Sequence, residues 1–361
     1  MDEIHALNPL KGRGAASNAT GRFEREKRIS VDDGWRHEEG EEDLPPLRTS
    51  VTLDKSRTII ARNSSPDVPF DRSINPYRGC EHGCVYCFAR PTHAFLGLSP
   101  GLDFETRLFA KPDAADLLAR ALRKPGYRCR VMALGTNTDP YQPIDRRMKI
   151  TRAVLEVLEA FGHPVGIVTK SALILRDADI LARMAERRLA RAFVSLTTLD
   201  SGLARKMEPR APTPGRRLEA ISGLAEAGVP VGVMTAPMIP GLNDHELEDL
   251  LTAAVGAGAT SAGFVLLRLP LEIEDLFSEW LSVHAPARAQ RVLNLMREAR
   301  GGKLYDSTFG ERMKGRGPYA KLIQQRFDRA SARLGFKRDA FALDTSLFRP
   351  PPAPGDQLSL L

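Results

Sequence analysis

Three cysteines lie close together and follow the pattern C-x3-C-x2-C: Cys80, Cys84 and Cys87. Cysteine thiolates are the usual protein ligands of iron–sulfur clusters, and a [4Fe–4S] cube normally takes four of them. Three thiolates leave the fourth iron with an open position, as three protein ligands do at a catalytic zinc. We therefore expect this segment to hold a [4Fe–4S] cluster whose fourth iron can bind a small molecule.

The residues around the cysteines suit a bulky, negatively charged group. Gly79 and Gly83 allow the loop to turn tightly. Three cationic side chains are placed to offset the charge of thiolates and sulfides: Arg78, His82 and Arg90.

Two other uses of the cysteines are open on the residues alone. A structural zinc ion would need a fourth ligand, for which His82 and Cys129 are the candidates. A ferredoxin-like electron carrier would need a fourth cysteine followed by proline, and Cys87 has no such successor. Cys129 stands apart from the other three, and we expect it to be a structural thiol.

The elements that must position this loop form an alternation of strands and helices. Short apolar segments that suit buried parallel strands occur at residues 73–77, 130–135, 165–170, 191–198, 230–236 and 261–269. The stretches between them have helical apolar periodicity, as at residues 113–124. Six such units predict a parallel sheet with right-handed crossovers, either a partial barrel or a doubly wound sheet. In both, chemistry gathers at the carboxyl ends of the strands, and the cysteine loop follows the first strand.

The cysteine pattern, with the aromatic Tyr86 before the last cysteine, resembles the signature of the radical S-adenosylmethionine (SAM) superfamily. The resemblance covers roughly residues 70–285 and implies an α/β fold, a partial (βα)6 TIM-like barrel with N- and C-terminal extensions. It also implies two cofactors, a [4Fe–4S] cluster and SAM. In this family the open iron chelates the methionine part of SAM, and reduction cleaves SAM to a 5′-deoxyadenosyl radical that abstracts hydrogen from the substrate.

A second stretch narrows the resemblance. Thr138-Asp139-Pro140-Tyr141-Gln142-Pro143 is similar to a Thr-Asp-x-Tyr-Gln-Pro stretch of the subgroup that contains spore photoproduct lyase and DNA-photolyase-like relatives. Residues that follow successive strands are thereby implied as SAM contacts, together with the tyrosine of the cysteine loop: Thr136, Asn137, Thr138, Asp139, Lys170, Ser195, Ala236 and Tyr86. The alternatives are an ordinary turn, a solvated lysine and a locally bonded serine.

The resemblance does not extend to the substrate. The lyase uses a cysteine after the second strand as hydrogen donor, and residues 132–136 contain none, so the catalytic residues are open. The charged segment Met207–Pro212, followed by Arg216 and Arg217, comes after the fourth strand. We expect its charges to face the mouth of the barrel, where they contact SAM or the substrate; the alternative is a surface ion pair.

The 361 residues are 42% hydrophobic, enough for a sizeable core. We expect four regions: a flexible N-terminal extension (1–55), the core barrel (56–285), a basic helical C-terminal extension (286–345) and a proline-rich tail (346–361). Apolar runs are far shorter than a membrane span of roughly 20 residues, and the N-terminus lacks a secretory pattern. We expect a cytoplasmic monomer without a membrane partner, because thiolate-held clusters favour a reducing compartment.

The formal net charge is +7, and the C-terminal extension interleaves basic and aromatic residues. This pattern is typical of DNA- or RNA-binding surfaces, although an amphipathic helix that covers the barrel would show it too. These observations support two candidate functions. The first is a radical SAM enzyme, reduced by a flavodoxin- or ferredoxin-like donor and acting on an open substrate class that includes nucleic acid. The alternative is a nucleic-acid-binding protein with a structural metal or cluster.

Overall fold

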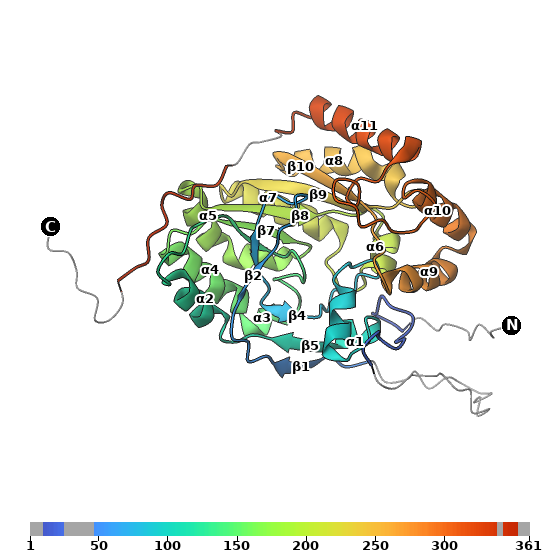
Figure 1. Ribbon diagram of the computed structural model, residues 1–361. Helices are drawn as coiled ribbons and strands as arrows, with labels where there is room; N and C mark the ends of the chain where they lie inside the picture. Colours follow the sequence, from blue (N-terminus) through green and yellow to red (C-terminus); the bar gives the residue numbers. More distant parts are fainter. Residues whose placement is uncertain (1–9, 25–46, 338–341, 353–361) are drawn as a thin grey trace.

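A computed structural model describes residues 10–24, 47–337 and 342–352 (Figure 1). Its main sheet has seven strands in the order β10-β9-β8-β7-β6-β3-β2. Their bounds are β2 Ile60–Arg62, β3 Arg72–Ile74, β6 Met132–Leu134, β7 Val165–Thr169, β8 Ala190–Ser195, β9 Val231–Met238 and β10 Ser261–Leu266. Within the described ranges, no helix combines the length and apolar character needed to cross a membrane.

The six strands from β3 to β10 are parallel, and only the edge strand β2 pairs antiparallel, with β3. The predicted six strands are confirmed. Their order never reverses along the sheet, whereas a doubly wound sheet has a point where it does. The arrangement is therefore the partial barrel of six βα units.

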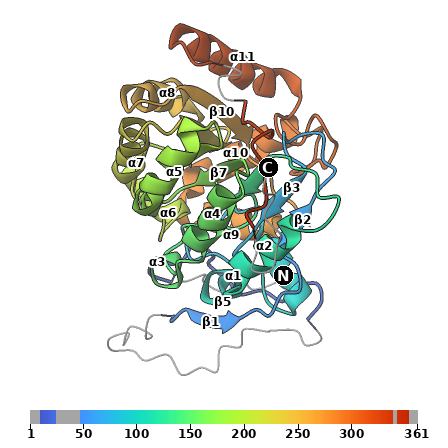
Figure 2. The ribbon, with the colours of Figure 1, turned by 90° about the vertical axis from the view of Figure 1, so that its left-hand side faces the viewer.

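Helices cover the outside of this sheet (Figures 1 and 2). The long ones are α2 Ala114–Leu122, α4 Ile150–Ala160, α5 Ala178–Glu186, α7 Pro214–Glu226 and α8 Leu247–Gly256. Each buries one apolar stripe, such as Leu117, Leu118 and Leu122 in α2. Shorter helical segments at the carboxyl ends of the strands are η1 Arg90–Leu96, α1 Leu102–Thr106, α3 Asp145–Met148, η2 Ala172–Asp177, α6 Ser201–Met207 and η3 Asp244–Glu246.

A second, three-stranded sheet was not predicted. It consists of β1 Ser50–Leu53, β5 Arg107–Ala110 and β4 Tyr77–Arg78, with β5 between the other two. The strand β4 has only two residues and β1 is mostly exposed, so neither has an apolar pattern that indicates a buried strand. The cysteine loop begins directly after β4.

Parts of the expected N-terminal extension and of the C-terminal tail are described, and both form hydrogen bonds with the rest of the protein. Residues 10–24 pack beside α1, and the backbone N–H groups of Gly14 and Ala15 donate hydrogen bonds to Glu105 at 3.0 and 2.9 Å. In the tail, the N–H of Arg349 donates to the carbonyl of Phe161 at 2.9 Å. Residues 1–9, 25–46, 338–341 and 353–361 lie outside the described residues.

After the barrel come α9 Ile273–His284, α10 Pro286–Glu298 and α11 Gly317–Arg333, the last matching the helix expected in the basic segment. The apolar side of α11 packs against β10 and α8, with the rings of Phe327 and Phe264 at 4.8 Å and an Arg326–Glu248 ion pair of 2.5 Å. This helix therefore covers the barrel, while Lys321, Arg329 and Arg333 are exposed on its other side.

Candidate functional site

The cysteine loop runs along the carboxyl ends of the parallel strands and is held there by backbone hydrogen bonds. The N–H of Cys80 donates to the carbonyl of Phe104 at 2.9 Å, and the N–H of Val85 donates to that of Met207 at 3.0 Å. All three cysteines are free thiols; Cys80 and Cys84 are buried and Cys87 is half-buried. The loop thus presents three unpaired thiols at the end of the barrel where chemistry is expected.

A fully buried arginine organises the middle of this loop. Arg90 donates to the carbonyls of Gly83 and Cys84 at 3.1 and 2.8 Å, and also to the carbonyls of Pro100 and Gly101. Its charge is paired with Glu105 at 2.5 Å. Since Glu105 also holds the 10–24 segment, this pair connects the cysteine loop to the N-terminal part of the chain.

The loop after β6 is tied to the cysteine loop by two further side chains. Gln142 accepts a hydrogen bond from the N–H of Glu81 at 2.9 Å and donates to the carbonyl of Gly79 at 3.1 Å. Asp139 lies 3.4 Å from His82 and accepts from the hydroxyl of Thr169 and the N–H of Lys170 at 2.7 and 2.8 Å. Although burial acts to raise the pKa of Asp139, the His82 charge and these donors lower it to about 2.

The loop also depends on close backbone approaches. Gly79 and Gly83 have φ values of 76° and 68°, a region that favours glycine. A Cβ on Gly14 would lie 1.8 Å from the carbonyl oxygen of Gly83, so only glycine allows residues 10–15 to pack directly on the cysteine loop. The glycines of the motif thus have the turning role that the sequence predicted.

Burial and several neighbouring charges shift the pKa values of the three thiols. Burial raises the pKa of Cys80, Cys84 and Cys87, and the charge of Glu208 adds to the effect at Cys84. The charge of Lys170 lowers the pKa of Cys84 and, together with the charge of Arg90, that of Cys87. The cations expected to offset the cluster charge are instead paired with carboxylates: Arg78 with Asp54, His82 with Asp139 and Arg90 with Glu105.

Lys170 directly follows β7 and sits at the rim of a polar network. Its Nζ lies 3.9 Å from Oε1 of Glu208 and 5.7 Å from the ring centre of Tyr86. The Tyr86 hydroxyl donates to Glu208, which also accepts from the Thr197 hydroxyl at 2.8 Å. A buried ion pair with Arg217 completes the surroundings of Glu208. The network joins the last turn of the cysteine loop to the ends of β7 and β8.

The other predicted contact residues fall at the same end of the barrel with different surroundings. Thr138 is buried and donates to the carbonyl of Tyr77 at 2.9 Å, which ties β6 to β4. Ser195 is buried at the end of β8, and its carbonyl accepts from Arg217 at 3.2 Å. Ala236 is half-buried near the end of β9. Thr136 and Asn137 are half-buried, and their side chains form no hydrogen bond within the described ranges.

Three positioning residues were not singled out from the sequence: Glu105, Gln142 and Asn243. The amide of Asn243 donates to the carbonyls of Thr197 and Pro237 at 2.8 and 3.0 Å and accepts from the N–H of Ile239 at 2.6 Å, which joins the ends of β8 and β9. The side chains of all three residues form hydrogen bonds with other loops. The sequence contains no direct signal of these bonds, apart from the position of a residue after a predicted strand or within a motif.

Among the described residues, no group of three or more His, Cys, Asp or Glu side chains is arranged to hold a single metal ion. A zinc site brings four donors within about 2.3 Å of one ion. An iron–sulfur cube instead has its irons at separate corners, so its thiolate ligands stand farther apart. Three free thiols, two of them buried and one half-buried, with a lysine acting on two of them, have donor chemistry that fits the cube.

Comparison with known proteins places this site in a family. The family model of the radical SAM superfamily matches residues 74–254. Uncharacterised proteins of Mycobacterium bovis and Mycobacterium tuberculosis are 39% identical over 257 residues, covering 70% of this chain and 76% of theirs. An uncharacterised protein of Methanocaldococcus jannaschii is 27% identical over 173 residues, covering 48% of this chain and 62% of its own.

Among solved structures, a spore photoproduct lyase mutant is similar, with a TM-score of 0.55, 17% sequence identity and coverage of 79% of this chain and 78% of its own. The same lyase in complex with a dinucleoside spore photoproduct has a TM-score of 0.54 at 16% identity and the same coverage. The predicted fold is thereby confirmed, together with the likeness to the lyase subgroup at the level of the fold. This chain belongs to the radical SAM superfamily.

Proposed function

We propose that Cys80, Cys84 and Cys87 hold a [4Fe–4S] cluster and that the protein is an enzyme that uses it to cleave SAM reductively. A reduced cluster of this kind, with SAM on its open iron, supplies the electron that splits SAM into methionine and a 5′-deoxyadenosyl radical. The observation that carries the proposal is the set of three free thiols at the mouth of the barrel, with Lys170 acting on two of them. Membership of the superfamily supports an enzyme.

The residues around the cysteines have two kinds of role in this proposal. Lys170 binds the carboxylate of SAM as a point charge, since its partner Glu208 lies at the long distance of 3.9 Å and is already paired with Arg217. Thr136 and Asn137 have side chains available for polar contacts with SAM, while Tyr86, Ser195 and Ala236 line the same mouth. Thr138 and Asp139, whose side chains bond to the protein itself, act as positioning residues.

The proposed substrate class is nucleic acid. The net charge of +7 and the exposed basic side of α11 support it. The likeness of fold to a lyase that binds a dinucleoside photoproduct is consistent with it. The reaction differs from that of the lyase in its hydrogen donor, because residues 132–136 contain no cysteine. We further propose a monomer in a reducing cytoplasm, served by a flavodoxin- or ferredoxin-like electron donor.

Anaerobic reconstitution followed by metal analysis and electron paramagnetic resonance tests the site. We expect iron and sulfide in equal amounts, and a signal of the reduced cluster that changes when SAM is added. Stoichiometric zinc, or a cluster signal that SAM does not alter, would contradict the proposal and favour a nucleic-acid-binding protein with a structural metal or cluster. Nucleic-acid binding alone does not separate the two, because both proteins would show it.

A further inference from the structure

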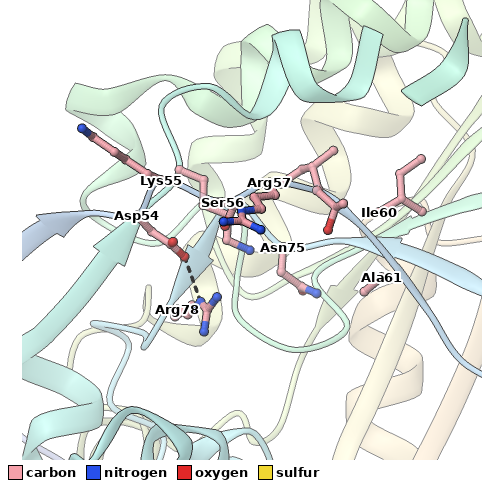
Figure 3. Close-up of a pocket in the computed structure, with 11 residues that line it drawn as sticks. Asp54, Lys55, Ser56, Arg57, Ile60, Ala61, Asn75 and Arg78 are labelled. Carbon is pink, nitrogen blue, oxygen red and sulfur yellow. Dashed lines mark hydrogen bonds and ion pairs between the residues drawn. The ribbon is translucent and has the colours of Figure 1, made fainter. Parts of the chain in front are cut away.

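A pocket of 440 Å³ opens beside the cysteine loop and has no part in the site described above (Figure 3). It is lined by residues 54–61 together with Asn75, Arg78 and Lys111. In the pairing of β2 with β3, Ile60 lies opposite Ile74, the last residue of β3. The pocket is therefore at the carboxyl end of β3, the end of the barrel from which the cysteine loop extends.

The pocket is strongly cationic. Four of its lining side chains are basic, Lys55, Arg57, Arg78 and Lys111, and one is acidic, Asp54. Asp54 is already paired with Arg78 at 2.9 Å (Figure 3). Within the described part of the chain, the other three cations have no ion-pair partner. Among the described residues, the lining of the pocket therefore carries more positive than negative charge.

The excess positive charge of the pocket destabilises the folded protein, because the Lys111 side chain that carries part of it is half-buried. Burial lowers the pKa of Lys111, and the charge of Arg78 lowers it further. Two like charges in a partly desolvated place are stabilised by an anion between them. Arginine forks bind the oxygens of phosphate in particular, since they can donate two parallel hydrogen bonds.

The pocket also offers a neutral polar group. The side-chain oxygen of Asn75 is buried and has no hydrogen-bond partner among the described residues. This amide can accept a hydrogen bond from a hydroxyl group, or turn to donate from its nitrogen to an anion. A phosphate ester of a sugar carries both kinds of group, anionic oxygens and hydroxyls.

We propose that this pocket binds the phosphate group of a nucleotide or of a nucleic-acid strand and anchors it beside the cysteine loop. The proposal rests on the proposed function in so far as it takes nucleic acid as the substrate class. Arg78 precedes Cys80 by two residues, so their Cα atoms are at most about 7 Å apart. A strand held by this pocket therefore passes the mouth of the barrel.

The test is fluorescence anisotropy with labelled single-stranded DNA and RNA over a range of salt concentrations, on the purified protein without reductant. The variant removes two unpaired cations, Arg57→Gln with Lys111→Gln, and leaves the Arg78–Asp54 pair intact. We expect binding at least tenfold weaker and a slope of log affinity against log salt that is smaller by about 1 to 2. The control, Arg120→Gln with Lys124→Gln, removes two exposed cations on and just after α2 and should bind like the wild type.

Competition with inorganic phosphate and with adenosine monophosphate identifies the source of the phosphate. Competition by the mononucleotide at low concentration indicates a nucleotide site, and competition only by oligonucleotides indicates a strand site. The charge-conserving single variant Lys111→Arg should bind oligonucleotide like the wild type. The proposal is wrong if the double variant binds oligonucleotide, mononucleotide and inorganic phosphate like the wild type. Because no SAM cleavage is measured, a protein that binds through this pocket yet forms no 5′-deoxyadenosine would contradict the proposed function and not this inference.

Discussion

The side chains of Arg90 and Glu105 form an ion pair of 2.5 Å, and neither has any exposed surface. Arg90 holds the carbonyls of the cysteine loop, and Glu105 holds the backbone N–H groups of Gly14 and Ala15. One buried pair thus joins the proposed cluster site to a segment that precedes Glu105 by some 90 residues in the chain. The charge of Arg90 therefore stabilises the packing of this segment on the cysteine loop, in addition to any role in offsetting the charge of the cluster.

Replacing Glu105 with Gln should lower the free energy of unfolding by about 3 to 5 kcal/mol, because it leaves the Arg90 charge buried without a partner. The double variant Glu105→Gln with Arg90→Met should recover part of this loss. Urea denaturation of the anaerobic protein measures both. Glu156→Gln is the control, since it breaks only an exposed pair with Arg152 and should change the free energy by less than about 0.5 kcal/mol. An equal loss in both single variants would contradict the role of the buried pair.

Gly14→Ala should displace residues 10–15 from the cysteine loop, because its Cβ would meet the Gly83 carbonyl at 1.8 Å. We expect a loss of about 1 to 3 kcal/mol in unfolding free energy and faster bleaching of the reconstituted cluster in air. Gly215→Ala is the matched control, since a Cβ there meets open space in the first turn of α7. A Gly14→Ala protein whose cluster bleaches at the wild-type rate would show that this segment does not shield the loop.

Lys170→Ala should weaken SAM binding about tenfold, because a charged hydrogen bond of roughly 1.5 kcal/mol is lost. Lys170→Arg keeps the charge and should lose less. Isothermal titration of the anaerobic, cluster-loaded protein gives the dissociation constant, and Lys124→Ala provides an exposed lysine as control. If Lys170→Ala binds SAM as tightly as the wild type, its charge acts only within the Glu208 network.

The free energy of unfolding should decrease as the pH is lowered, because His163 takes up a proton more readily in the unfolded chain than in the folded one. Burial, together with the nearby charge of Arg72, lowers the pKa of this imidazole from 6.5 to about 4. Between these values the unfolded chain binds a proton that the folded chain does not, so stability decreases as the pH falls from 6.5 towards 4. The full effect is roughly 3 kcal/mol at about 1.4 kcal/mol per pKa unit.

Thermal denaturation from pH 7.5 to 4.5 measures this effect, with His163→Gln as the comparison. The imidazole accepts from the Tyr127 hydroxyl at 2.8 Å, so the variant is expected to be less stable at every pH. The informative quantity is the slope of stability against pH, which should be smaller in the variant. Equal slopes would assign the pH dependence to other groups.

The sequence predicts the main sheet well because its six parallel strands contain only buried or half-buried residues. Strands such as β7 and β8 are short, apolar and rich in branched or small residues, and each is followed by a periodic helix. The small sheet has no such signal: β4 has two residues, and β1 has one half-buried residue among exposed ones. Its strands form because β5 pairs with both, a relationship that local pattern does not contain.

For the site, the sequence indicates loops that the structure brings together, but not the partner of each side chain. The cysteine motif and the segment after β6 lie together, as expected. The bonds of Asp139 to Thr169 and of Gln142 to the cysteine loop join residues about 30 and 60 positions apart. Thr138 was predicted as a SAM contact, and its hydroxyl bonds to Tyr77. Such pairings depend on how the loops at the barrel mouth pack, which periodicity and spacing do not specify.

Reductive cleavage of SAM at the three-cysteine site is the central activity proposed for this protein. The direct measurement is the 5′-deoxyadenosine formed when the reconstituted, anaerobic protein is mixed with SAM and dithionite, quantified by liquid chromatography. We predict its formation by the wild type and by Cys129→Ser, whose thiol lies before β6 at the amino end of that strand. Cys84→Ala should form none. Failure of the cluster-loaded wild type to form 5′-deoxyadenosine, or equal yields from wild type and Cys84→Ala, would contradict the account.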